Sequence, residues 1–116
     1  MARTDFITQV RAMGYDPRDY GTHIEFEYEA PVGSNIGKKV QVAFVVDDSF
    51  PMNCPTGPSF KQLDAGWLHA PNNVHPNYFG FGEGWFYWSR PFPEWNTTEH
   101  TVKAYMAHVR RVLATV

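Results

Sequence analysis

The chain has only one cysteine, Cys54, and no run of apolar residues long enough to cross a membrane. A single cysteine cannot form a disulfide within the chain, which favours a reducing compartment and excludes a cysteine-based zinc cluster. The amino-terminal residues also lack the apolar core of a signal peptide. We therefore expect a cytoplasmic protein without a membrane segment.

Clustered charge is absent as well. The formal net charge is -2, and lysine and arginine never occur in runs longer than two residues. We therefore expect no binding to nucleic acid or to an anionic membrane. The histidines do not have the spacing of a metal motif, and nothing in the sequence brings His69 and His75 together with Asp47 or Asp48. The sequence therefore predicts no metal and no cofactor.

Aromatic residues, in contrast, are concentrated in one stretch. Residues 75–95, HPNYFGFGEGWFYWSRPFPEW, contain three of the four tryptophans. Exposing all these rings would leave an adhesive patch, so we expect them to complete the core or to line a binding groove. Gly80, Gly82 and Gly84 are followed by aromatics and prolines instead of a helix, which argues against a phosphate loop. We interpret them as glycines that let the backbone turn tightly near large rings.

The first half of the chain predicts a helix and two strands. A helix is expected over about residues 4–13, with Thr4 as its N-cap. Apolar and polar residues alternate over residues 23–30 and again over residues 40–46, as in half-buried strands of a hairpin. In the first of these strands His23 shares the polar face with three glutamates. We expect that face to be solvated.

The second half begins with a corner. Prolines and a glycine in residues 47–60 forbid regular structure, so we expect the chain to turn there. A third strand is expected over residues 59–63, and residues 64–74 are expected to be irregular.

A final helix is expected from about Thr98, with Asn96 or Thr97 as its N-cap and Glu99 in its first turn. Its apolar residues recur at helical spacing: Val102, Tyr105, Met106, Val109, Val112 and Leu113. The order of elements predicts one α+β domain over residues 1–116, in which both helices pack against an antiparallel sheet.

Two groups of residues are candidates for a site. Flat rings beside a guanidinium can stack on a peptide or a sugar, which makes candidate binding residues of Trp85, Tyr87, Trp88, Arg90 and Trp95. Alternation places Trp85 and Tyr87 on one face and Phe86 and Trp88 on the other, so at least half of these rings are expected in the core. Cys54 is either a packing residue or a nucleophile, although no neighbouring base is apparent.

Several of these features resemble the ubiquitin-conjugating (UBC) fold. They are the proline corner FPMNCPTGP, the tripeptide His75-Pro76-Asn77 and the later Trp95. The block formed by Trp85, Trp88, Ser89 and Arg90 is similar to that of bacterial UBC-like proteins of prokaryotic family E. The resemblance implies a meander sheet with an N-terminal helix and a C-terminal amphipathic helix packed against it.

The chain departs from that family at the catalytic position. Ten residues after His75, where a conjugating enzyme has its thioester cysteine, this chain has Trp85. An indole cannot carry an acyl group, so His75 and Asn77 are expected to brace the loop instead. The resemblance then implies a non-catalytic domain that binds a ubiquitin-like protein or its ThiF-type activating enzyme. Such bacterial systems also include a JAB-type isopeptidase.

Two alternatives remain open. The chain is an active conjugating enzyme if Cys54 serves as a displaced thioester nucleophile near His75 and Asn77. Without the family resemblance, it is an aromatic-groove module that binds a peptide or a carbohydrate.

Overall fold

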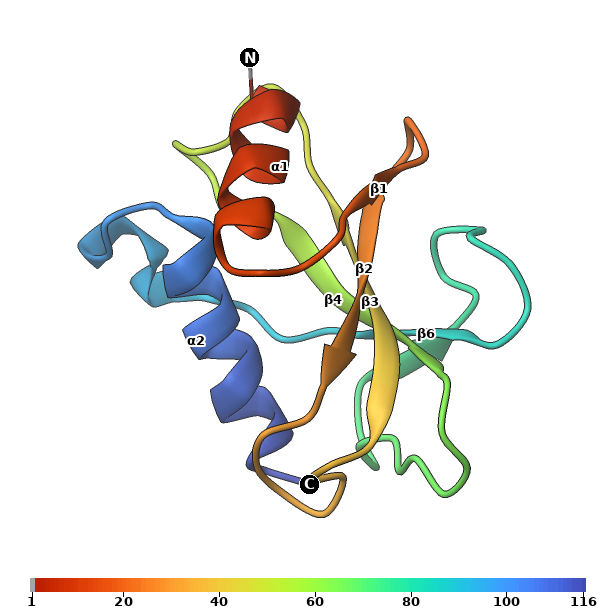
Figure 1. Cartoon of the computed structure of the whole chain (residues 1–116). Helices are drawn as coiled ribbons and strands as arrows, with labels where there is room; N and C mark the ends of the chain where they lie inside the picture. The colour runs from red at the N-terminus through yellow and green to blue at the C-terminus, as the bar shows by residue number, and fades with distance from the viewer. Residues whose placement is uncertain (1) are drawn as a thin grey trace.

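A computed structural model describes residues 2–116 and shows two helices beside one sheet (Figure 1). The elements, in chain order, are α1 (Ala2–Ala12), β1 (Arg18–Asp19), β2 (Ile24–Glu29), β3 (Lys39–Val45), β4 (Thr56–Gln62), β5 (Val74–Pro76), β6 (Trp85–Trp88), the 3₁₀ helix η1 (Pro93–Thr97) and α2 (Val102–Leu113). Within these residues, six strands form one antiparallel sheet in the order β1-β2-β3-β4-β6-β5. The predicted α+β class is confirmed.

The central meander places its apolar residues on one face. Phe26 pairs with Val42, and Val42 pairs with Phe60 in the next strand. Both helices lie on this side of the sheet (Figure 1). The ring of Tyr105, from α2, meets Phe44 edge-on at a centroid distance of 5.2 Å. Because these side chains are buried together, the face forms the main hydrophobic core.

β4 begins earlier than the sequence predicts. It starts at Thr56 and includes Gly57 and Pro58, although proline cannot donate a ladder hydrogen bond. The register between β3 and β4 shifts between Ala43 and Val45, so Val45 pairs with Thr56. This irregularity absorbs the mismatch at the proline. The strand therefore extends into the corner that was expected to be irregular.

Both predicted helix starts are wrong. α1 begins at Ala2, so Thr4 lies inside the helix. α2 begins at Val102, and the hydroxyl of Thr101 caps it by accepting a hydrogen bond from the backbone N–H of Ala104 at 3.2 Å. His100 has a φ of 57°, which no α-helix accommodates, so Glu99 lies outside the helix.

The predicted caps Asn96 and Thr97 belong to η1 instead. The indole N–H of Trp95, in the middle of η1, donates to the backbone oxygens of Pro51 and Met52 at 3.1 and 3.2 Å. These bonds fasten the proline corner to the segment that leads into α2. A local capping signal cannot reveal them because the partners are more than 40 positions apart in the sequence.

None of the helices in the described part of the chain is both long and apolar enough to cross a membrane.

Candidate functional site

β6 carries large rings on both faces of the sheet. Trp88 is fully buried on the helix side, where its ring lies 4.7 Å from that of Phe60. Trp85 lies on the opposite, outer face and is 5% exposed. The ladder pairs Phe86 with Phe60 and Tyr87 with Ser59, so the predicted alternation along this segment is confirmed.

The burial of the tryptophans corrects their predicted role. Trp85, Trp88 and Trp95 are all at most 5% exposed. Side chains this deeply enclosed cannot stack directly on a partner. Of the predicted binding residues, only Tyr87 and Arg90 are partly accessible.

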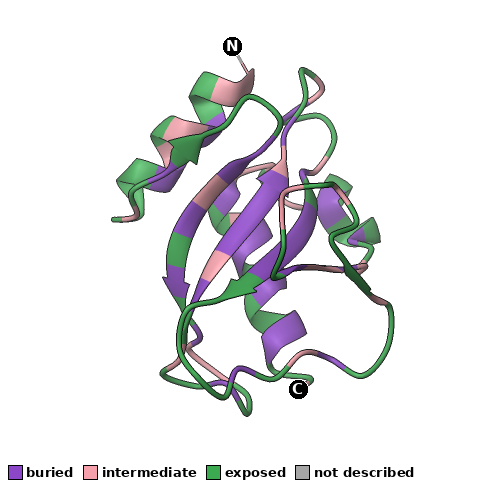
Figure 2. Cartoon of the chain, turned by 90° about the vertical axis from the view of Figure 1, so that its right-hand side faces the viewer, coloured by how far each residue is buried: buried purple, intermediate pink, exposed green. Residues whose placement is uncertain are grey.

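Residues 77–84, which we call the aromatic loop, fold back over the outer face. The ring of Phe81 stacks on His23 at 3.8 Å and meets Trp85 edge-on at 5.8 Å. Figure 1 shows this loop on the side of the sheet away from the helices, and Figure 2 looks onto it from that side. Ala43 and Ser59, on the outer face, are at most 1% exposed. The outer face therefore has a packed layer of its own.

Asn77 shapes the aromatic loop. Its backbone N–H donates to the carbonyl oxygen of Trp85 at 2.7 Å, and its side-chain oxygen accepts from the N–H of Gly82 at 3.0 Å. Gly80 and Gly84 adopt left-handed φ values of 75° and 90°. The loop joins two strands, so it lacks the strand, loop and helix order of a phosphate site.

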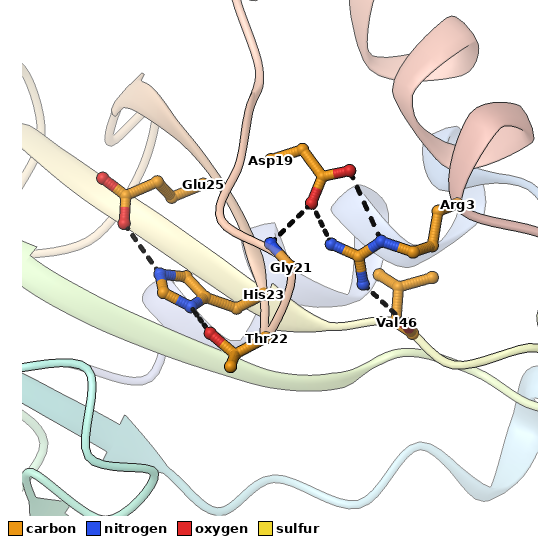
Figure 3. A network of polar contacts seen from close by, with 7 residues as sticks. All are labelled: Arg3, Asp19, Gly21, Thr22, His23, Glu25 and Val46. Atoms are coloured by element: carbon orange, nitrogen blue, oxygen red, sulfur yellow. Dashed lines mark hydrogen bonds and ion pairs between the residues drawn. The ribbon is translucent and has the colours of Figure 1, made fainter.

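His23 was expected on a solvated face but is only 6% exposed. The aromatic loop covers it. Figure 3 shows its Nε2 facing the carboxylate of Glu25, and the two atoms lie 3.0 Å apart. The amide of Gln41 donates to the other Glu25 oxygen at 3.1 Å. Alternation assigned His23 to the correct face. It could not show that a loop more than 50 residues later covers that face.

The same view shows how β1 is held (Figure 3). Arg3 pairs with Asp19 and also donates to the carbonyl oxygen of Val46 at 3.0 Å. Hydrogen bonds from the Arg3 guanidinium and from the backbone N–H of Gly21 lower the pKa of the Asp19 carboxyl. This exposed pair ties α1 to the edge of the sheet that adjoins His23.

Four rings remain at the surface beside β6, and we call them the aromatic surface: His75, Tyr78, Phe79 and Tyr87. Tyr78 is 62% exposed and its ring lies 5.1 Å from that of Tyr87. Phe79 and His75 lie 4.8 and 6.1 Å from Tyr87. Sequence reasoning missed Tyr78 and Phe79 as binding residues, because their clustering depends on the path of the aromatic loop.

Arg90 lies next to the aromatic surface and braces the connection into β5. Its guanidinium donates to the carbonyl oxygens of Ser89 at 2.9 Å and of Asn72 at 3.0 Å. It also lies 5.9 Å from the centre of the Trp88 ring. Among residues 2–116, no carboxylate forms an ion pair with Arg90. In that part of the chain, the hydrogen-bond acceptors of its guanidinium are all backbone carbonyl oxygens.

A pocket of about 290 Å³ opens beside Tyr87 and contains Cys54, and we call it the Cys54 pocket. Thr56, Ser89, Arg90 and Tyr105 also line it. Burial raises the pKa of the Cys54 thiol, so the neutral thiol predominates at neutral pH. His75 does not line the pocket, but it is the ladder partner of Tyr87, which does.

The histidines considered for a metal have other contacts. His69 Nδ1 accepts a hydrogen bond from the Trp88 indole at 3.1 Å, whereas His75 lies against Tyr78 and Tyr87. Among residues 2–116, no three histidine, cysteine, aspartate or glutamate side chains are placed to share a metal ion.

Comparisons with protein-family models, with curated proteins and with solved structures find no match.

The half-buried His69 predicts a pH dependence of stability. Burial lowers its pKa from 6.5, and its hydrogen bond from Trp88 requires an unprotonated Nδ1. The unfolded chain protonates His69 at a higher pH than the folded chain does. The neutral His69 therefore contributes fully to the free energy of unfolding above pH 6.5. This contribution declines as the pH falls from there towards the folded pKa. Denaturant midpoints measured between about pH 7.5 and about pH 5 should show this loss.

His69→Gln should flatten that decline. The buried His108 also has a lowered pKa, so part of the slope should remain. His75→Gln, at an exposed position, is the matched control for replacing a histidine with glutamine. If the stability of His69→Gln declines as steeply with falling pH as that of the parent chain, His69 is not the group responsible.

Proposed function

We propose that this chain is a non-catalytic UBC-like domain that binds a ubiquitin-like protein or its ThiF-type activating enzyme in a cytoplasmic bacterial modification system. The main observation in favour of a non-catalytic domain is the environment of Trp85. It stands where the family resemblance places the thioester cysteine, and it is 5% exposed between the aromatic loop and the sheet. The Trp85 side chain is packed in the interior and has no group to which an acyl chain can be attached.

The order of elements supports the UBC-like assignment. In chain order, α1 is followed by the β2-β3-β4 meander, which has the proline corner between β3 and β4, and later by the amphipathic α2. The tripeptide from His75 to Asn77 leads from β5 into the aromatic loop. The resemblance supplies the partners: the ubiquitin-like protein, the activating enzyme and a JAB-type isopeptidase encoded with them.

The aromatic surface supports a binding role. Tyrosines that combine a large apolar ring with a hydroxyl are enriched at protein interfaces. Tyr78 and Tyr87 are held close together by ring contacts with Phe79, so little side-chain freedom is lost when a partner binds. The arrangement favours a partner that contacts the outer face of the sheet near β6.

A second candidate function is conjugation through Cys54. The specific observation in its favour is the Cys54 pocket, which brings the proline corner beside Tyr87, the ladder partner of His75. Against it, the raised pKa of the Cys54 thiol leaves little thiolate to attack an acyl adenylate or a thioester.

We expect no thioester on Cys54. After incubation with the ubiquitin-like protein, the activating enzyme and ATP, a non-reducing gel should show no thiol-sensitive adduct of this chain. Cys54→Ser is the matched control because it removes the only thiol. An adduct that forms on the parent chain and is missing from Cys54→Ser would establish the second candidate instead.

We expect binding to depend on Tyr78. Central aromatic anchors cost about 2 kcal/mol or more on truncation, so Tyr78→Ala should weaken binding by roughly thirtyfold. Titration of the ubiquitin-like protein and of the activating enzyme, followed by calorimetry, measures this change. Ile36→Ala is the control because Ile36 is 64% exposed, close to the 62% of Tyr78, but lies in the β2–β3 connection. Equal affinity for the two variants would place the partner elsewhere.

A further inference from the structure

Tyr105 lines the Cys54 pocket, and its hydroxyl has no hydrogen-bond partner within residues 2–116. The residue is 1% exposed, and its ring is packed against Phe44 and Phe92. Among residues 2–116, no group forms a hydrogen bond with its hydroxyl, which lies within electrostatic reach of Cys54 and Tyr87. The hydroxyl is not enclosed in the way that the unpaired polar atoms of Ser59, Trp67 and His100 are, and Tyr105 is one of the residues that line the pocket.

The rest of the lining supplies further donors and one positive charge. Thr56, Tyr87 and Ser89 line the pocket, and none of their hydroxyls has a side-chain hydrogen bond within the described residues. Arg90 also borders it, and three hydrogen bonds to carbonyl oxygens leave part of its guanidinium unused. None of the described residues that line the pocket is an aspartate or a glutamate. Its electrostatic character therefore favours an acceptor that carries negative charge.

The size of the pocket and its single positively charged side chain, Arg90, restrict the class of ligand that it can bind. A volume of about 290 Å³ holds a planar acid with a short aliphatic or peptide body, and Pro55, Pro91 and Phe92 offer that body an apolar wall. A phosphate carries close to two negative charges and is usually bound by several donors with more positive charge. One guanidinium and neutral hydroxyls match the single charge of a carboxylate better.

We propose that the Cys54 pocket is a carboxylate-binding site in which the Tyr105 hydroxyl and the Arg90 guanidinium are the principal donors. The site goes beyond the proposed function and does not depend on it, since the pocket is formed by this chain alone. The carboxylate comes either from a polypeptide, as a chain terminus or an acidic side chain, or from a free small acid.

Cys54 provides a reporter inside the site because it is the only cysteine. The rate of its alkylation by uncharged iodoacetamide is measured with increasing amounts of four probes. They are N-acetyl-alanyl-alanine with a free carboxylate, the same dipeptide as its amide, N-acetyl-glutamate α-amide, and butyrate. A bound carboxylate should slow alkylation by about tenfold at nine-tenths occupancy, whereas the dipeptide amide should leave the rate unchanged.

The four probes also distinguish between the possible sources of the carboxylate. Protection by the dipeptide acid alone identifies a chain terminus, protection by the glutamate derivative alone identifies an acidic side chain, and protection by butyrate alone identifies a small acid. Protection by several acids supports a site that recognises the carboxylate itself. Equal protection by the dipeptide acid and its amide, or no protection by any acid, would overturn the proposal.

Tyr105→Phe removes only the hydroxyl and keeps the ring that packs in the core. It should weaken protection by at least about fivefold in apparent affinity, as the loss of one hydrogen bond to a charged group predicts. Tyr28→Phe is the matched control because Tyr28 is also buried but does not line the pocket. Arg90→Gln should also weaken protection, and if it fails to fold, Tyr105→Phe remains decisive. Undiminished protection in Tyr105→Phe would refute the site.

Discussion

The packing of β6 on both of its faces is the constraint on which the rest of the structure depends. Trp88 requires a cover on the helix side, and Phe60 and Trp67 provide it together with the main core. Trp85 requires a cover on the outer side, and the aromatic loop provides it through Phe81. Because large rings point both ways from one short strand, the sheet has a packed layer on either side of this strand. This second layer distinguishes the sheet from a meander in which one face is open to solvent.

The same constraint determines which groups remain available to other molecules. Burial removes the tryptophans from the surface and leaves Tyr78, Tyr87 and their neighbours there. Tyr87 belongs both to the aromatic surface and to the lining of the Cys54 pocket. A protein bound to the aromatic surface would therefore lie at the mouth of the pocket. The aromatic surface and the Cys54 pocket share Tyr87, whereas Tyr78 belongs only to the first and Tyr105 only to the second.

The sequence predicts the elements with strong local periodicity and misses features that depend on distant contacts. Alternation identified β2 and β3, and helical spacing identified the buried face of α2, because both patterns report burial directly. The cap of α2 was misplaced because Trp95 is anchored to the proline corner. The burial of His23 and the exposure of Tyr78 both follow from the path of the aromatic loop. A loop rich in glycine has no periodicity from which that path can be predicted.

The proposed function requires a protein partner to bind the outer face beside β6. This binding can be followed in nuclear magnetic resonance spectra of the isotopically labelled chain, recorded as the ubiquitin-like protein or the activating enzyme is added. We expect amide shifts to change first in residues 74–79 and 87–90, which carry the aromatic surface and Arg90. Shifts confined to the exposed side of α2 or to the β2–β3 connection, with none in those two segments, would contradict it.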